Sequence, residues 1–242
     1  MKSKRVVILQ SNYIPWKGYF DLVGFADEMI FLDDVQFTKN DWRNRNRIQT
    51  PQGVQWLTVP CGQGIRRLTN EVELGAEPWQ AKHFKTLEQN YRKATHFDEL
   101  APFLEQVYLK SEWKYLSELN QFLVRELSAR YLGIETTFLD SRDFPGSERR
   151  QQRVLDILAR TGATHYLSGP RGRDYLEPRA FGDAGVRLEY IRFDDYPVYE
   201  QLYGEFEHGV SVLDLIFNAG PRARDYMMIG NKTIEEIVDV GG

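Results

Sequence analysis

The chain is poor in cysteine and histidine. It has one cysteine, Cys61, among 242 residues, so no disulfide can form within it, and a reducing compartment suits it. Its four histidines are scattered, and together with Cys61 they do not match the spacing of a zinc site. We therefore expect no metal centre, and the sequence identifies no cofactor.

Long hydrophobic runs are also missing. The basic N-terminus is followed by only four apolar residues, Val6–Leu9, fewer than the hydrophobic region of a signal peptide contains. No stretch approaches the roughly 20 apolar residues that a membrane span needs. The sequence therefore predicts a cytoplasmic protein without a membrane span.

An excess of positive charge is the third absence. The formal net charge is −4, which argues against nucleic acid as a partner, because nucleic-acid binding needs a broad basic surface. The remaining composition is 42% hydrophobic and 27% charged, an ordinary balance for a globular protein. The aromatic content of 13% suits concave binding surfaces, although aromatic side chains also fill cores.

The hydrophobic pattern alternates between strand-like and helix-like segments. Short apolar runs typical of buried strands occupy residues 6–9, 29–32, 136–139, 165–167 and 186–193. A helix-like segment joins the first two runs, which makes a βαβ unit of the kind that builds parallel sheets. We predict an α/β fold with a mainly parallel, Rossmann-like sheet.

Two segments depart from this alternation. Residues 42–60 have a period of two around a turn at Gly53, which predicts a β-hairpin with Arg43, Arg45 and Arg47 on one face. Residues 78–132 have helical spacing and are too long for a single crossover helix, so they predict an inserted helical subdomain.

These segments suggest a division of the chain. The predicted domains are an α/β core of residues 1–76 and 134–230, a helical insertion of residues 77–133 and a C-terminal tail of residues 231–242. Smaller predictions are a strand at residues 72–74 and a helix that Ser147 caps.

Polar and aromatic side chains gather where the predicted strands end. The residues concerned are Gln10, Asn12, Tyr13 and Trp16 after the first strand, Asp33, Asp34 and Gln36 after the second, and Ser168, Gly169, Arg171 and Tyr175 after a later one. Because ligands of parallel sheets bind beyond the carboxyl ends of the strands, we expect these residues to form one ligand pocket.

Each candidate also has a purely structural interpretation. Asp33 and Asp34 suit a general base toward an attacking amine, yet aspartate often caps a turn. Arg45 and Arg47 suit phosphate or carboxylate, but charged residues also protect strand edges. His83 is either a general base or a packing residue of its helix. We predict Asp33, Asp34 and His83 as catalytic, and the arginines as ligand-binding.

Several segments together resemble the WbqC-like family over nearly the whole chain. They are QSNYIPWKGYFDLV, ADEMIFLDDVQFTKNDWRNRNRI, WLTVP, WQAKHFKTLEQNY, HYLSGPRGRDYL, YPVYEQLYGEF and SVLDLIFNAG. The resemblance implies a role in bacterial O-antigen and other surface-polysaccharide biosynthesis. It also implies a small-molecule substrate that bears phosphate, such as a nucleotide sugar, with an acyl or aminoacyl donor as a second partner.

The first βαβ unit is also similar to that of adenylate-forming nucleotidyltransferases. Those enzymes carry His-x-Gly-His where this chain has Trp16, Lys17, Gly18 and Tyr19. The similarity implies a nucleotidyltransferase-like sheet, with Gly18 allowing a phosphate to approach the helix N-terminus. Since both histidines are replaced, it implies ligand binding there rather than nucleotidyl transfer.

The two resemblances, together with these residues, imply two alternative functions. The first is a transferase that moves an acyl or aminoacyl group onto an amino group of an activated sugar. The second is a nucleotide- or nucleotide-sugar-binding protein without catalysis.

Overall fold

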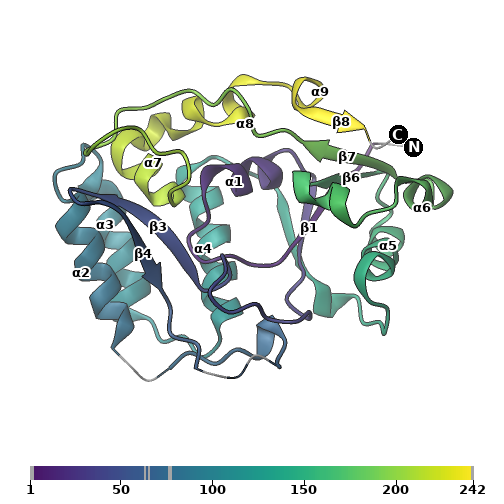
Figure 1. Ribbon diagram of the computed structural model, residues 1–242, viewed down its shortest axis with the longest axis horizontal. Coiled ribbons are helices and arrows are strands. Elements are labelled where there is room, and N and C mark those ends of the chain that lie inside the picture. Colours follow the sequence, from purple (N-terminus) through teal and green to yellow (C-terminus); the bar gives the residue numbers. More distant parts are fainter. Residues whose placement is uncertain (1–2, 63, 65, 76–77, 241–242) are drawn as a thin grey trace.

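A six-stranded sheet forms the centre of the computed structural model, which describes residues 3–62, 64, 66–75 and 78–240 (Figure 1). Its strands are β1 (Arg5–Leu9), β2 (Glu28–Phe31), β5 (Thr137–Asp140), β6 (His165–Ser168), β7 (Arg187–Ile191) and β8 (Val238–Val240). Their order is β5-β2-β1-β6-β7-β8, with β8 antiparallel to β7 and the other pairs parallel. The α/β fold with a mainly parallel, Rossmann-like sheet is confirmed.

Helices cover both faces of this sheet, which is why its strands are apolar runs. On one face α5 (Arg150–Thr161) and α6 (Pro178–Asp183) pack against alternate residues of the strands, such as Val6 and Ile8. On the other face α1 (Lys17–Gly24), α4 (Leu116–Tyr131) and α7 (Val212–Ala219) share a larger core with Val7 and Met29.

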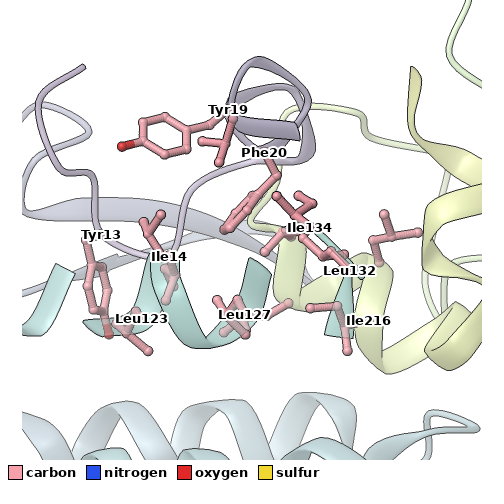
Figure 2. Packing of buried hydrophobic residues seen from close by; sticks show 14 of the residues in the cluster. Tyr13, Ile14, Tyr19, Phe20, Leu123, Leu127, Leu132, Ile134 and Ile216 are labelled. Atoms are coloured by element: carbon pink, nitrogen blue, oxygen red, sulfur yellow. The ribbon is translucent and has the colours of Figure 1, made fainter. Parts of the chain in front are cut away.

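The larger core continues into the helices predicted over residues 78–132. These are α2 (Trp79–Tyr91), α3 (Phe97–Glu105), the π-helical turn η2 (Gln106–Lys110) and α4. Figure 2 shows Tyr13 and Ile14 of the loop after β1 beside Leu123 and Leu127 of α4, with Phe20 directed into the same layer. The loop that begins at the end of β1 is therefore anchored by apolar packing.

The predicted hairpin is also confirmed. β3 (Arg45–Thr50) and β4 (Gly53–Thr58) form a separate antiparallel pair, joined by a turn in which Gly53 has a φ of 96°. Ile48 and Leu57 are buried on one face, while Arg45, Arg47 and Trp56 lie on the other. Arg43 precedes the strand and lies in a turn.

Two local predictions are wrong. Residues 72–74 follow the 3-10 helix η1 (Thr69–Glu71) and form only an isolated bridge, Glu73 to Tyr115, because the partner segment enters α4 at Leu116. Ser147 does not cap α5, which begins at Arg150. The loop before α5 stays open because Arg153 and Arg160 bind the carbonyls of residues 144 and 145.

The remaining elements are short. They are the 3-10 helices η3 (Ser141–Asp143), η4 (Pro170–Asp174) and η5 (Gly220–Tyr226), and the helices α8 (Met228–Asn231) and α9 (Ile234–Ile237). In the part of the chain that the structure describes, no helix combines the length and the apolar character needed to cross a membrane.

Candidate functional site

A cavity of about 480 Å³ opens beyond the carboxyl ends of β1 and β6. The chain turns from β1 toward β2 and from β6 toward β7, so this is the topological switch point at which such sheets bind ligands. We call it the switch-point cavity. It is lined by Leu9, Gln10, Asn12, Pro15, Trp16, Tyr19, Asp41, Trp42, Arg43, Asn46, Arg47, Arg171 and Gly209.

The amides of the β1 loop form one wall and are fixed by an arginine. Arg43 Nε donates to Gln10 Oε1 at 2.9 Å, and its Nη1 donates to Asn12 Oδ1. Gln10 Nε2 donates in turn to Thr69 Oγ1 at 3.2 Å. Gln10 and Asn12 therefore line the cavity, in orientations set by neighbouring side chains.

Trp16 forms the second wall, at the start of α1. Its indole lies edge-on to Phe193, with ring centroids 5.0 Å apart, and it also packs against Gly18. A Cβ at Gly18 would overlap the indole, so the glycine accommodates Trp16 rather than leaving an open approach for phosphate. Tyr19 is buried, with 4% of its surface exposed, and its hydroxyl donates to the Gln10 carbonyl at 3.2 Å.

The outer face of the hairpin supplies an aromatic and basic rim. The indoles of Trp42 and Trp56 lie with centroids 5.5 Å apart, and both are partly exposed. The Arg45 guanidinium stacks on Trp56 at 4.3 Å, while Arg47 Nε donates to the Gly209 carbonyl at 2.8 Å. Arg47 lines the cavity, and Arg45 lies beside it on the same hairpin face.

The loop after β6 brings Arg171 to the cavity from far along the chain. Its side chain is exposed, and among the residues that the structure describes none forms a hydrogen bond or ion pair with its guanidinium. Tyr175 is 64% exposed. Its pKa lies above 10.0, because partial burial and the charge of Asp174 outweigh the nearby charge of Arg43. Ser168 is buried and donates to the Gly169 carbonyl, so these two shape the turn behind Arg171.

Asp33 does not line the switch-point cavity. It is 1% exposed, and its two oxygens accept from the Ser11 N–H and from Gln121 Nε2, each at 2.9 Å. Desolvation raises the pKa of this carboxyl, although both hydrogen bonds favour its ionised form. The structure therefore places Asp33 as an internal acceptor between the β1 loop and α4.

Asp34 faces the opposite side of the same loop. Its Oδ2 lies 2.7 Å from Arg153 Nη2, and its Oδ1 accepts from Ser141 Oγ at 2.7 Å. Together with Gln36 it lines a second cavity, which we call the α5 cavity. The structure thus separates Asp34 and Gln36 from Gln10 and Asn12.

His83 and Tyr13 belong to a third place, inside the helical layer. The Tyr13 hydroxyl lies 2.8 Å from His83 Nδ1 and 2.5 Å from the Tyr108 hydroxyl. Burial lowers the pKa of His83 from 6.5 to about 4, so the ring is neutral at pH 7. Tyr13 is fully buried, and its side chain does not reach the switch-point cavity.

Eight lining residues fall outside the predicted site: Leu9, Pro15, Tyr19, Asp41, Trp42, Arg43, Asn46 and Gly209. Arg43 had a signal in the sequence, since it alternates with Arg45 and Arg47, but only the turn before β3 directs it toward Gln10. Asp41 lies in the same turn and accepts from Thr38 Oγ1 and the Trp42 N–H, at 2.9 and 2.7 Å.

A buried lysine lies directly behind Trp16. The Lys17 ammonium donates to the Tyr226 carbonyl at 3.0 Å and lies 4.4 Å from the centre of the Tyr196 ring. Burial lowers its pKa from 10.5 to about 8 and raises that of Asp21, one turn later, from 3.8 to about 6. Lys17 is 3% exposed, so it ties α1 to the C-terminal segments rather than facing a ligand.

Metal ligands are not grouped in this structure. Within residues 3–62, 64, 66–75 and 78–240, no cluster of three or more His, Cys, Asp or Glu side chains could hold a metal ion.

Comparison with known proteins places the chain in a family. The model of the WbqC-like protein family matches residues 10–226. An uncharacterized protein of Mycobacterium tuberculosis (strain ATCC 25618 / H37Rv), Rv1507c, is 44% identical over 227 residues, which cover 93% of this chain and 97% of the relative. No solved structure matches. The matched region contains the loop after β1, the hairpin and Arg171, all of which line the switch-point cavity. The chain belongs to the WbqC-like protein family.

Proposed function

We propose that the switch-point cavity binds a small molecule that bears phosphate and a ring, such as a nucleotide sugar. The chain would then be a cytoplasmic transferase of bacterial surface-polysaccharide or O-antigen biosynthesis, moving an acyl or aminoacyl group onto an amino group of the activated sugar. The observation that carries this proposal is Arg171, an exposed guanidinium without a described partner at the switch point of the sheet.

The basic groups of the cavity suit phosphate. Arg171 offers its full set of N–H donors. Arg47 forms a hydrogen bond from Nε to the Gly209 carbonyl, and its Nη2 lies 3.9 Å from Glu207 Oε1. A planar guanidinium can bind a phosphate through two parallel hydrogen bonds, which is stronger and more directional than a single contact. Arg47 and Arg171 line the cavity from different elements, the hairpin and the loop after β6, and both support binding of an anion.

The remaining walls suit the rest of such a substrate. The indoles of Trp16 and Trp42 offer ring faces and edges for stacking. The amides of Gln10 and Asn12 are fixed by Arg43 and can pair with hydroxyl, carbonyl or amide groups. A fixed polar wall beside aromatic walls is the usual composition of a small-molecule site.

Asp41 is the carboxylate among the lining residues, and we assign it the role of general base. As the amine attacks, its nitrogen forms the bond to the acyl carbon and its proton passes to Asp41. The bond between the acyl group and its donor breaks, and that electron pair leaves with the donor. The catalytic roles of Asp33, Asp34 and His83 stay predictions. Each of these side chains is hydrogen-bonded to other residues outside the switch-point cavity.

Binding of UDP-glucose, measured by calorimetry, tests the site. Arg171→Gln should weaken binding about tenfold or more, because a charge-assisted pair is lost. Arg179→Gln is the matched control, since Arg179 is an exposed arginine on α6, away from the cavity. Equal affinity of the wild type and Arg171→Gln would overturn the assignment of the site.

The second candidate function is ligand binding without catalysis. It is favoured by the positions of Asp33, Asp34 and His83, all outside the switch-point cavity. A UDP-amino sugar and an acyl-coenzyme A, incubated with the protein and followed by mass spectrometry, separate the two functions. A product made by the wild type and lost in Asp41→Asn, with sugar binding kept, supports the transferase; binding without any product supports the second function.

A further inference from the structure

The α5 cavity has about 650 Å³ and lies beyond the ends of β2 and β5, on the far side of the loop that ends at Gln36. It is lined by Leu32, Asp34, Val35, Gln36, Leu68, Gly146, Ser147, Glu148, Arg149, Arg150 and Arg153. We propose that it is a second small-molecule site, for a phosphate or carboxylate compound with an apolar body.

Arg153 forms a buried and fixed part of the wall of this cavity. Its side chain is 4% exposed, and its guanidinium donates to Asp34 Oδ2 at 2.7 Å and to the carbonyls of Ser141 and Phe144 at 2.9 and 2.6 Å. Asp156 Oδ2 also accepts from Arg153 Nη1, at 3.4 Å, so four groups hold this buried cation in a single orientation. Burying a charged guanidinium costs free energy, and such a rigid support is typical of a formed site rather than a surface depression.

Two further arginines leave the wall with uncompensated charge. Arg149 and Arg150 line the cavity, and no other residue in the described ranges forms a hydrogen bond or ion pair with either guanidinium. Arg153 and Asp34 neutralise each other, and Glu148 offsets one of the two free charges. The remaining positive charge and ten unused N–H donors suit a singly or doubly charged anion.

The floor of the cavity is apolar. Leu32, Val35 and Leu68 line it, and Leu68 is 37% exposed despite its size. A bare phosphate would leave these side chains facing water, whereas a compound with an apolar body would cover them and gain from their burial. The two kinds of wall together point to an anion attached to an apolar group.

The two cavities approach each other at Gln10 and Gln36. Gln10 lines the switch-point cavity, and its Nε2 lies 3.4 Å from the carbonyl of Gln36, which lines the α5 cavity. This juxtaposition bears on the proposed function, on which it rests: a transferase needs two substrates close together, and these cavities would seat them on either side of Gln10.

Calorimetric titration with phenyl phosphate tests the inference. We expect two classes of site in the wild type, one of which weakens about tenfold or more in the double variant Arg149→Gln and Arg150→Gln. Both arginines are exposed, so the variant keeps the fold, which its thermal melting curve verifies. Arg179→Gln is the matched control, and Leu68→Ala should weaken phenyl phosphate more than inorganic phosphate.

The outcomes separate this inference from the proposed function. A single class of site, weakened by Arg171→Gln and unchanged in the double variant, overturns the α5 site and leaves the switch-point site. A single class that weakens only in the double variant supports the α5 site and leaves the switch-point site to the UDP-glucose titration of Arg171→Gln. No binding at millimolar phenyl phosphate overturns the α5 site.

Discussion

Two groups of residues that the sequence predicts as site residues have different surroundings. Gln10, Asn12, Trp16, Arg47 and Arg171 line the switch-point cavity. Asp33, Tyr13 and His83, from the same or neighbouring segments, are bound to interior partners. Both groups contain polar side chains that the sequence predicts to act on a ligand. They differ in whether another part of the chain supplies a hydrogen-bond partner for those side chains.

This difference shows what a polar strand end can and cannot indicate. Asp33 meets the Ser11 N–H and Gln121 of α4, so its acceptor capacity is used within the fold. Arg171 meets no such group among the described residues. A buried polar group must be paired to be tolerated, whereas an unpaired one at a cavity is available to a ligand. The three predictions below test this contrast, from the largest effect to the smallest.

Asp33→Ala should lower the free energy of unfolding by about 4 kcal/mol, because two buried donors lose their acceptor at about 2 kcal/mol each. Asp41→Ala is the control from the cavity wall and should cost about 1 kcal/mol or less. Chemical denaturation at pH 7 measures both. Equal losses in the two variants would remove the contrast between interior and cavity carboxylates.

His83 should make stability depend on pH. Its pKa falls from 6.5 in the unfolded chain to about 4 in the fold, so the unfolded state binds more protons between these values. Stability therefore rises from pH 4 to pH 6.5, by about 3 kcal/mol for this group, and is flat above. Asp33 and Asp21, whose pKa values are raised from 3.8 (that of Asp21 to about 6), act in the opposite direction above pH 3.8.

Subtracting the curve of a variant isolates the histidine. His83→Gln removes the titration, so the difference in unfolding free energy between wild type and variant should grow across this pH range. A difference that stays constant from pH 4 to 7 would mean that His83 is not buried in a neutral form. The prediction of His83 as a general base would then regain support.

Gly18→Ala should have the smallest effect on stability, about 2 kcal/mol, because the new Cβ overlaps the Trp16 indole and forces it to move. It should also weaken UDP-glucose binding, since Trp16 forms a wall of the cavity. Gly182→Ala on α6 has open space around it and should gain about 0.5 kcal/mol. Unchanged binding in Gly18→Ala would show that the position of Trp16 does not matter to the ligand.

The fold was accessible to sequence reasoning where one segment determines its own structure. The apolar runs at residues 6–9 and 29–32 match β1 and β2 within a residue. The strand predicted at residues 72–74 fails because its outcome depends on where α4 begins, which is information from elsewhere in the chain.

The site was only partly accessible for the same reason. The positions of Gln10 and Arg171 follow from the rule for strand ends. The separation of Asp34 from Asn12 depends on Arg153, which is 119 residues away in sequence, and nothing local to Asp34 predicts that pair. Arg43 enters the cavity because a turn ends before β3, and boundaries of elements are the least predictable feature of a sequence.

The spread of the cavity walls along the chain has a kinetic consequence. Arg47 reaches Gly209 across 162 residues, and Lys17 reaches the Tyr226 carbonyl across 209. Contacts of such separation form late, because the chain between them must be ordered first. During synthesis, β1 and its polar loop leave the ribosome long before the segments that complete the cavity. We therefore expect ligand-binding competence to appear abruptly, at nearly full chain length, rather than to build up with each added segment.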